Sequence, residues 1–113
     1  MTEHCLFCQI VERKISAKLV YEGKEVEAFY DIHPQAPVHI LIIPKKHIAG
    51  VSEAGKEDQA LLGELILVAG EIARKQNIAD YRLIFNNGEQ AGQSVFHAHL
   101  HLLGGRRFNW PPG

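Results

Sequence analysis

Apolar and polar side chains alternate along several stretches of the chain, and this alternation predicts β-strands. The run LVYEG at 19–23 and the run EVEAFYDI at 25–32 predict a hairpin that turns about Lys24. The largely apolar run VHILIIPK at 38–45 predicts a strand ending at Pro44, after the two prolines of HPQAP have interrupted the sheet. RLIFNNG at 82–88 predicts a further strand.

Apolar residues at helical spacing predict two helices. Over 56–77, Leu61, Leu65, Val68 and Ile72 recur every three or four residues, which predicts a long amphipathic helix. A shorter helix is expected over 5–13, with three apolar residues on its inner side: Leu6, Phe7 and Ile10.

The last apolar run, VFHAHLHLL at 95–103, carries a histidine at every second position. As a strand it would place His97, His99 and His101 on one face. The other face would carry Ala98, Leu100 and Leu102, which have the character of core residues. With this strand the chain is expected to form an α+β domain, an antiparallel five-stranded sheet with one long and one short helix.

Composition narrows the class of protein. A length of 113 residues fits one domain, and a net charge of −1 gives no basic excess for nucleic acid. The strongly apolar stretch HILIIP at 39–44 is too short to span a membrane, and MTEHCLFCQI lacks the features of a signal peptide. A cytoplasmic location is therefore expected, where Cys5 and Cys8 would not form a structural disulfide.

The loop before the histidines has the composition of an anion site. Residues 86–94, NNGEQAGQS, combine glycines with Asn, Gln and Ser side chains that can donate hydrogen bonds to a phosphoryl group. The alternative is an ordinary hairpin turn. Because the loop leads directly to the three histidines, a phosphate site is favoured.

The three histidines have alternative interpretations. One interpretation is a solvated edge strand, but the apolar residues between the histidines indicate that the other face of the strand is in the core. If the imidazoles themselves were buried without partners, they would destabilise the fold. A catalytic zinc site held by all three is opposed by geometry, because a strand separates the Cα atoms of His97 and His101 by about 13 Å. A central nucleophile flanked by hydrogen-bond donors fits the spacing better.

The stretch from His97 to Leu103 resembles the histidine-triad (HIT) signature, His-φ-His-φ-His-φ-φ with φ apolar. The resemblance extends over FYDIHPQAPVHILIIPKKH, GQSVFHAHLHLLGGR and the terminal WPPG, which are similar to the Hint branch, the purine nucleoside phosphoramidases. It implies that 1–113 is a single HIT domain. It also implies a homodimer, with the tail 105–113 at the subunit interface.

The resemblance implies a role for each matching residue. His99 would attack the α-phosphorus of a nucleotide and form a covalent nucleotidyl-histidine, which water then hydrolyses to AMP or GMP. The remaining catalytic positions are His101, His97, His39 and Ser94. The substrate-binding positions are Asp31 for the ribose; Asn86, Gly92, Gln93 and Ser94 for the phosphate, beside His99, Leu100 and His101; and Leu6, Phe7, Ile10, Phe29, Ile32 and Leu41 for the purine.

The pair Cys5 and Cys8 matches zinc-bearing members of the family. Their other two ligands match His47 and His97, so a closed Cys₂His₂ site for structural Zn²⁺ is expected, not required for the chemistry. The alternative is two half-buried thiols with no metal.

The resemblance implies a hydrolase that cleaves the P–N bond of purine nucleoside 5′-phosphoramidates, such as an adenylated amine or lysine. Two alternatives remain open. One is a hydrolase of dinucleoside polyphosphates or other adenylated anhydrides. The other is a nucleotide-binding or zinc-binding regulatory module with negligible turnover, which would not need His99, His101 and Ser94. The expected partners are the nucleotide and a second copy of the chain, without nucleic acid or membrane.

Overall fold

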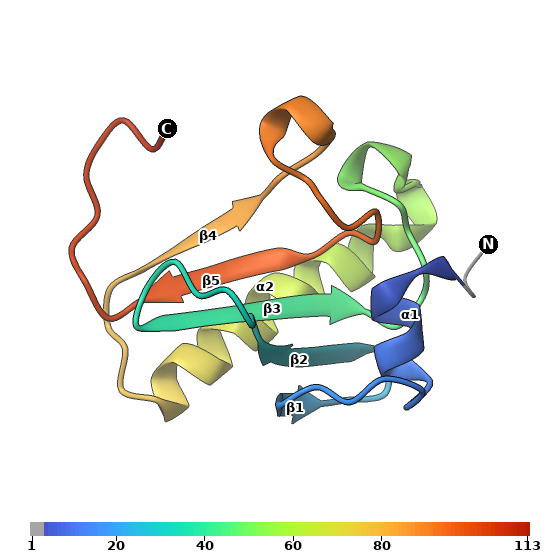
Figure 1. Cartoon of the computed structure of the whole chain (residues 1–113), viewed down its shortest axis with the longest axis horizontal. Coiled ribbons are helices and arrows are strands. Elements are labelled where there is room, and N and C mark those ends of the chain that lie inside the picture. Colours follow the sequence, from blue (N-terminus) through green and yellow to red (C-terminus); the bar gives the residue numbers. More distant parts are fainter. Residues whose placement is uncertain (1–3) are drawn as a thin grey trace.

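The computed structural model of the chain describes residues 4–113. Five strands form one antiparallel sheet in the order β1-β2-β3-β5-β4 (Figure 1). The α+β class and the five-stranded sheet are thereby confirmed. The strands are β1 Leu19–Glu22, β2 Val26–Tyr30, β3 Val38–Pro44, β4 Tyr81–Phe85 and β5 Leu100–Gly104.

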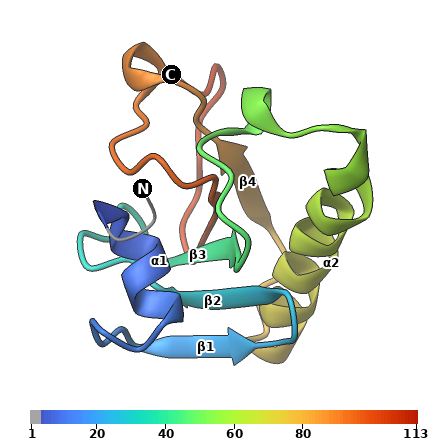
Figure 2. The same cartoon turned by 90° about the vertical axis from the view of Figure 1, so that its right-hand side faces the viewer.

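Two α-helices lie on opposite faces of this sheet: α1, Leu6–Val11, and α2, Gln59–Lys75 (Figure 2). Helix α2 begins three residues later than expected, because Lys56–Asp58 form a 3₁₀ turn, η3. The Asp58 carboxylate accepts from the Gly55 N–H at 2.9 Å and from Lys46 Nζ at 2.6 Å. Within residues 4–113, no helix is both long enough and apolar enough to cross a membrane.

The main core lies between the sheet and α2. The four α2 residues predicted from the helical repeat are all buried there. They pack against alternate residues of the central strands, namely Val26, Ala28, Ile40, Ile42, Leu100 and Leu102. The hydrophobic pattern therefore identified the face of each strand that meets the long helix.

A second apolar cluster lies on the other face, beneath α1. It contains Cys5, Phe7, Cys8, Ile10, Phe29, Leu41 and Ile43. Leu6 was expected on the inner side of this helix but is 43% exposed, so that prediction is wrong. The buried positions of this short helix are Phe7, Cys8 and Ile10.

Arg13 fastens the end of α1 to the sheet. It has a left-handed backbone (φ 63°), and its guanidinium donates to Ile10 O and to Glu27 Oε2, each at 2.9 Å. Glu27 is fully buried on β2 and forms an ion pair with Arg13. This contact fixes α1, which contains Cys8 and is capped by Cys5, over the face of the sheet that holds the histidines.

The histidine segment is only partly a strand, which corrects the prediction of a strand over 95–103. Strand β5 begins at Leu100, and the preceding residues follow a bent path. Their hydrogen bonds go elsewhere: Ala98 N–H donates to Ile48 O at 2.6 Å, and Val95 O accepts from Gln93 Nε2 at 3.1 Å. Because of this bend, His97 and His101 belong to different groups of side chains.

Candidate active site and metal centre

His99 lies in the middle of the site and is buried. Its Nδ1 is 2.7 Å from the carbonyl oxygen of His97. A carbonyl only accepts hydrogen bonds, so Nδ1 carries the hydrogen and Nε2 of the neutral ring carries the lone pair. The edge of the Phe7 ring packs against the imidazole, with centroids 5.1 Å apart. The ring of His99 is therefore fixed with its lone pair on Nε2, the form that a nucleophilic imidazole requires.

A second pair of imidazoles lies beside His99. The His101 ring centroid is 4.9 Å from that of His99, and its Nδ1 is 2.9 Å from His39 Nε2. The pairing register explains this contact: Leu41 faces His101 and His39 faces Leu103, so the two histidines are diagonal neighbours on one face. Asp31 Oδ2 is 3.4 Å from His39 Nε2 and completes the group.

Burial keeps these imidazoles neutral. Burial lowers the pKa of His101 to about 4, and nearby His99 and His39 contribute to the decrease. The pKa values of His99 and His39 are also lowered, again mainly by burial, although the Asp31 carboxylate opposes the decrease in both. At neutral pH the lone pair of His99 is thus available for attack.

In the loop of residues 86–94, several of the backbone N–H groups that could face an anion are already bonded within the loop. The N–H groups of Ala91, Gly92 and Gln93 donate to carbonyl oxygens within the loop, at 3.1, 3.0 and 3.1 Å. The physical reason is the 3₁₀ turn η4, Glu89–Ala91, which ends at Gly92 in the left-handed region (φ 101°). Among residues 4–113, the N–H groups of Ser94 and Val95 have no partner and stay available to a ligand.

Gln93 organises this loop with its side chain. Its Oε1 accepts from Gly88 N–H at 2.8 Å, while Nε2 donates to Ala49 O at 2.8 Å and to Val95 O. The carboxamide is buried and engaged at both ends, so it fixes the loop and leaves no donor for phosphate. Asn86 lies against Gly92, and Ser94 is exposed at the end of the loop.

The residues expected to line a purine pocket divide into two groups. Phe7, Ile10, Phe29 and Leu41 are buried in the cluster beneath α1. Leu100, which was expected beside the phosphate, lies in the main core. Leu6 and Ile32 are exposed, Ile32 to 84%. Among the residues expected for the purine, only Leu6 and Ile32 therefore offer apolar surface to a ligand, while the buried ones belong to the core beneath α1.

Four metal-ligating side chains meet at the end of α1. Cys5, Cys8, His47 and His97 each place a ligand atom within 4.8 Å of the others. His97 Nδ1 is 3.3 Å from Cys5 Sγ, 3.5 Å from Cys8 Sγ and 3.2 Å from His47 Nδ1. His97 Nε2 donates to Pro44 O at 2.7 Å, so the lone pair at Nδ1 faces the other three ligands.

These distances fit a tetrahedral zinc ion. Zn–S bonds of about 2.3 Å and Zn–N bonds of about 2.0–2.1 Å place sulfur about 3.5 Å from nitrogen and two nitrogens about 3.3 Å apart. Burial raises the pKa of the Cys8 thiol to about 12, with the neighbouring Cys5 contributing, so Cys8 would ionise only beside a cation. The four residues could therefore hold a structural metal.

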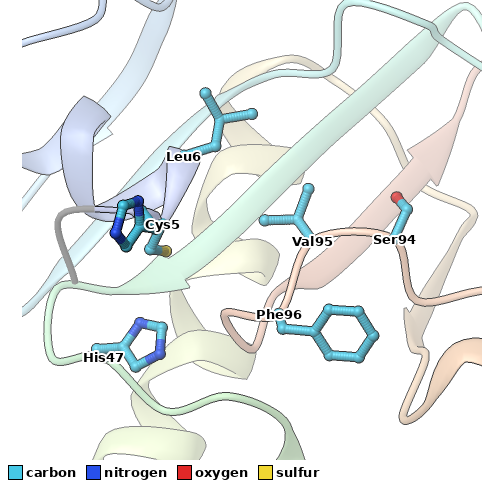
Figure 3. A pocket seen from close by; sticks show the side chains of 7 residues that line it. Cys5, Leu6, His47, Ser94, Val95 and Phe96 are labelled. Atoms are coloured by element: carbon cyan, nitrogen blue, oxygen red, sulfur yellow. The ribbon is translucent and has the colours of Figure 1, made fainter. Parts of the chain in front are cut away.

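A hollow of about 390 Å³ adjoins this cluster. Figure 3 shows Leu6 on one side of it, Val95 and Phe96 on another, and Ser94 at one end. Cys5 and His47 also line it. The hollow thus lies between the cluster of possible metal ligands and Ser94, at the end of the loop of residues 86–94.

Two contributors to the site were not found from the sequence. Gln35 donates its backbone N–H to His39 Nδ1 at 3.0 Å, and Arg106 donates to the carbonyl of Gln35. Backbone contacts of this kind leave no residue-type signal. The only hint in the sequence was that the segment HPQAP, which contains Gln35, lies a few residues before His39.

The fold and site define a class: a small α+β domain whose antiparallel sheet holds a buried, neutral imidazole beside two more histidines and a carboxylate. A family model described as the HIT domain matches residues 12–108. The chain therefore belongs to the HIT domain family.

Known proteins agree with this assignment. A HIT-like protein of Synechocystis sp., described as uncharacterized, is 54% identical over the full length of both chains. The crystal structure of a HIT family hydrolase from Legionella pneumophila Philadelphia 1 is 48% identical, with a TM-score of 0.95 over 97% of this chain and 100% of that one. A HIT family hydrolase from Clostridium thermocellum is 46% identical, with a TM-score of 0.92 over 95% of each chain.

Proposed function

We propose that the protein is a hydrolase of purine nucleoside 5′-phosphoramidates that works through a covalent nucleotidyl-histidine. One observation carries the proposal: His99 has its Nδ1–H fixed on a carbonyl, and a buried ring nitrogen of its neighbour, His101 Nε2, has no partner among residues 4–113. A phosphoryl group would meet both needs: its phosphorus is an electrophile for His99, and one of its oxygens can bond to the buried Nε2 of His101.

The proposed reaction has two steps, attack by His99 and then attack by water. His99 Nε2 attacks the α-phosphorus, the P–N bond to the amine breaks, and the departing nitrogen takes a proton delivered from solvent through the Ser94 hydroxyl. Water then attacks the phosphorus, the P–Nε2 bond breaks, and one proton of that water returns to solvent. The products are the amine and a nucleoside monophosphate, with the ribose hydroxyls donating to Asp31.

In this proposal zinc has a structural role and takes no part in the two steps. The Cys₂His₂ set has four protein ligands and therefore no open position for substrate, which is typical of structural zinc. When bound, the ion would ionise the two thiols and hold α1, the 47–48 loop and the histidine segment together. A reducing cytoplasm would keep both thiols available to it.

The experiment uses adenosine 5′-phosphoramidate as the substrate. Mass spectrometry of protein quenched during turnover should detect a fraction of chains with a single added adenylyl group, together with AMP and ammonia as products. Diadenosine tetraphosphate should be a much poorer substrate. Faster cleavage of the dinucleotide would favour the anhydride hydrolase, and nucleotide binding without turnover of either would favour the regulatory module.

We also propose a homodimer joined through α2 and β4. Strand β4 is an edge strand of the sheet, and the outer side of α2 exposes Ile66 and Leu67 between Gly63 and Gly70. Trp110 in the tail is 81% exposed, although tryptophan is typical of interfaces. A two-fold dimer would cover these surfaces and bring each tail near the partner's site.

Removal of Asn109–Gly113 should alter the choice of leaving group. The chain is ended at Phe108 because that ring packs on Arg82 and Arg106 and belongs to the folded domain. The ratio of kcat/KM for bulky and small phosphoramidates should change by about tenfold, since one apolar contact contributes roughly 1–3 kcal/mol of discrimination. Sedimentation should show a dimer at micromolar protein. A concentration-independent monomer would disprove the dimer, and an unchanged ratio would leave the tail without a catalytic role.

A further inference from the structure

The hydrogen bond between Gln35 and His39 determines where His39 carries its hydrogen. The backbone N–H of Gln35 points at His39 Nδ1, 3.0 Å away, and a backbone N–H is always a donor. Nδ1 must then hold the lone pair, and the neutral ring carries its hydrogen on Nε2.

The position of the hydrogen on His39 in turn determines the position of the hydrogen on His101. The hydrogen on His39 Nε2 has two acceptors within reach, His101 Nδ1 at 2.9 Å and Asp31 Oδ2 at 3.4 Å. The shorter contact makes His101 Nδ1 the acceptor, so neutral His101 carries its hydrogen on Nε2. That atom is the buried nitrogen without a partner among residues 4–113. The burial that lowers the pKa of both rings favours these neutral forms.

Arg106 holds the other end of Gln35. Its Nε and Nη2 donate to the Gln35 carbonyl at 3.3 and 3.1 Å. The Phe108 ring lies 4.2 Å from the guanidinium carbon and supports it. Gly105 permits the close approach: its φ is 91°, and a Cβ there would lie 2.9 Å from Pro37 Cβ.

We infer that Arg106 is a positioning residue for the phosphoryl site. It holds Gln35 so that the Gln35 N–H fixes His39, and through His39 also His101, with hydrogen on Nε2. His101 can then only donate to a phosphoryl oxygen, and it stabilises the charge that grows there during attack by His99. The catalytic part of this inference rests on the proposed function, whereas the hydrogen positions do not.

The chain of hydrogen bonds also separates this group from the metal cluster. Asp31, His39 and His101 place ligand atoms within 4.8 Å of one another and could hold an ion by spacing alone. A metal on His39 Nε2 would need the hydrogen on Nδ1, where it would face the Gln35 N–H at 3.0 Å. That clash of two donors disfavours metal here, so one zinc per chain is expected.

Histidine tautomers can be measured directly. In protein labelled with ¹⁵N-histidine, long-range ¹H–¹⁵N correlation spectra distinguish hydrogen on Nδ1 from hydrogen on Nε2. Wild-type protein should show His39 and His101 both with hydrogen on Nε2 at neutral pH. Arg106→Gln should give a mixture at one or both rings with the backbone spectrum otherwise retained. The matched control is Arg107→Gln, because Arg107 makes no side-chain hydrogen bond or ion pair with residues 4–113.

Kinetics with adenosine 5′-phosphoramidate should follow the tautomers. Arg106→Gln should lower kcat roughly tenfold with KM nearly unchanged, because the donor acts mainly in the transition state. Arg106→Lys should recover part of the loss, since an ammonium donates to a carbonyl but lacks the planar fork. Hydrogen on Nδ1 of His101 in the wild-type protein would overturn the inference. So would tautomers and rates in Arg106→Gln that match those of Arg107→Gln. If the tautomers behave as expected but phosphoramidate is not cleaved, only the proposed function fails.

Discussion

Replacing His99 by alanine should reduce phosphoramidate turnover by at least three decades, roughly 4 kcal/mol of barrier. In the proposed mechanism the imidazole provides the Nε2 lone pair that attacks phosphorus, and its Nδ1–H is already fixed by the His97 carbonyl. AMP should still bind within about threefold of wild type, because the ribose acid Asp31 and the His101 donor remain. Stopped-time assays and AMP titration measure the two quantities on one preparation.

His99→Asn is the cleaner variant, since an amide keeps some polarity where Phe7 packs against the ring. His33→Asn is a matched control: His33 is an exposed histidine next to the site, and only its backbone N–H contacts Asp31. The control should retain near wild-type activity. If either His99 variant kept more than about a tenth of the wild-type rate, a loss below ~1.4 kcal/mol, the covalent mechanism would be wrong.

Replacing Cys8 by serine should remove bound zinc and lower the melting temperature by about 10 °C, which corresponds to roughly 2 kcal/mol in a domain of this size. Cys8 Sγ contacts both His47 Nδ1, at 3.3 Å, and His97 Nδ1. A serine hydroxyl is a poor zinc ligand and leaves three ligands around an ion that needs four. Elemental analysis of protein purified without chelator should give near one zinc per wild-type chain.

Ala73→Ser controls for the burial of a hydroxyl, because Ala73 is fully buried on α2, away from the cluster. It should keep its zinc. In excess chelator, wild-type protein and Cys8→Ser should melt at similar temperatures. Wild-type protein that contains no metal and melts unchanged in chelator would dispose of the zinc site. Complete loss of chemistry on gentle chelation, with the fold intact, would instead support a catalytic zinc.

The periodic parts of the sequence predicted the fold well. The apolar repeat in α2 and the alternation in β3 each indicate which side of the element packs against apolar neighbours. They therefore predicted which face of the sheet meets α2. The start of β5 was missed because the bend before Leu100 is fixed by one backbone contact, Ala98 N–H to Ile48 O, which has no counterpart in residue type.

Some parts of the candidate site could be predicted from the sequence and others could not. The metal cluster could be assembled from Cys5, Cys8, His47 and His97 because a ligand must have a particular chemistry wherever the chain places it. For the loop of residues 86–94, composition did not reveal that the N–H groups of Ala91, Gly92 and Gln93 bond within the loop, and its phosphate site stays a prediction. Gln35 was missed because it acts through a peptide group that every residue except proline possesses.

The carbonyl that orients His99 also affects how long a phosphorylated histidine would survive. In a serine protease triad, a carboxylate stabilises the positive imidazolium that forms during the reaction. Here the partner of Nδ1–H is the neutral oxygen of His97, and the ring is buried. A nucleotidyl group on Nε2 would leave a cationic ring with little compensating charge in direct contact. Such an adduct is high in energy and its imidazole leaves easily, so the covalent species should be short-lived and ready for water.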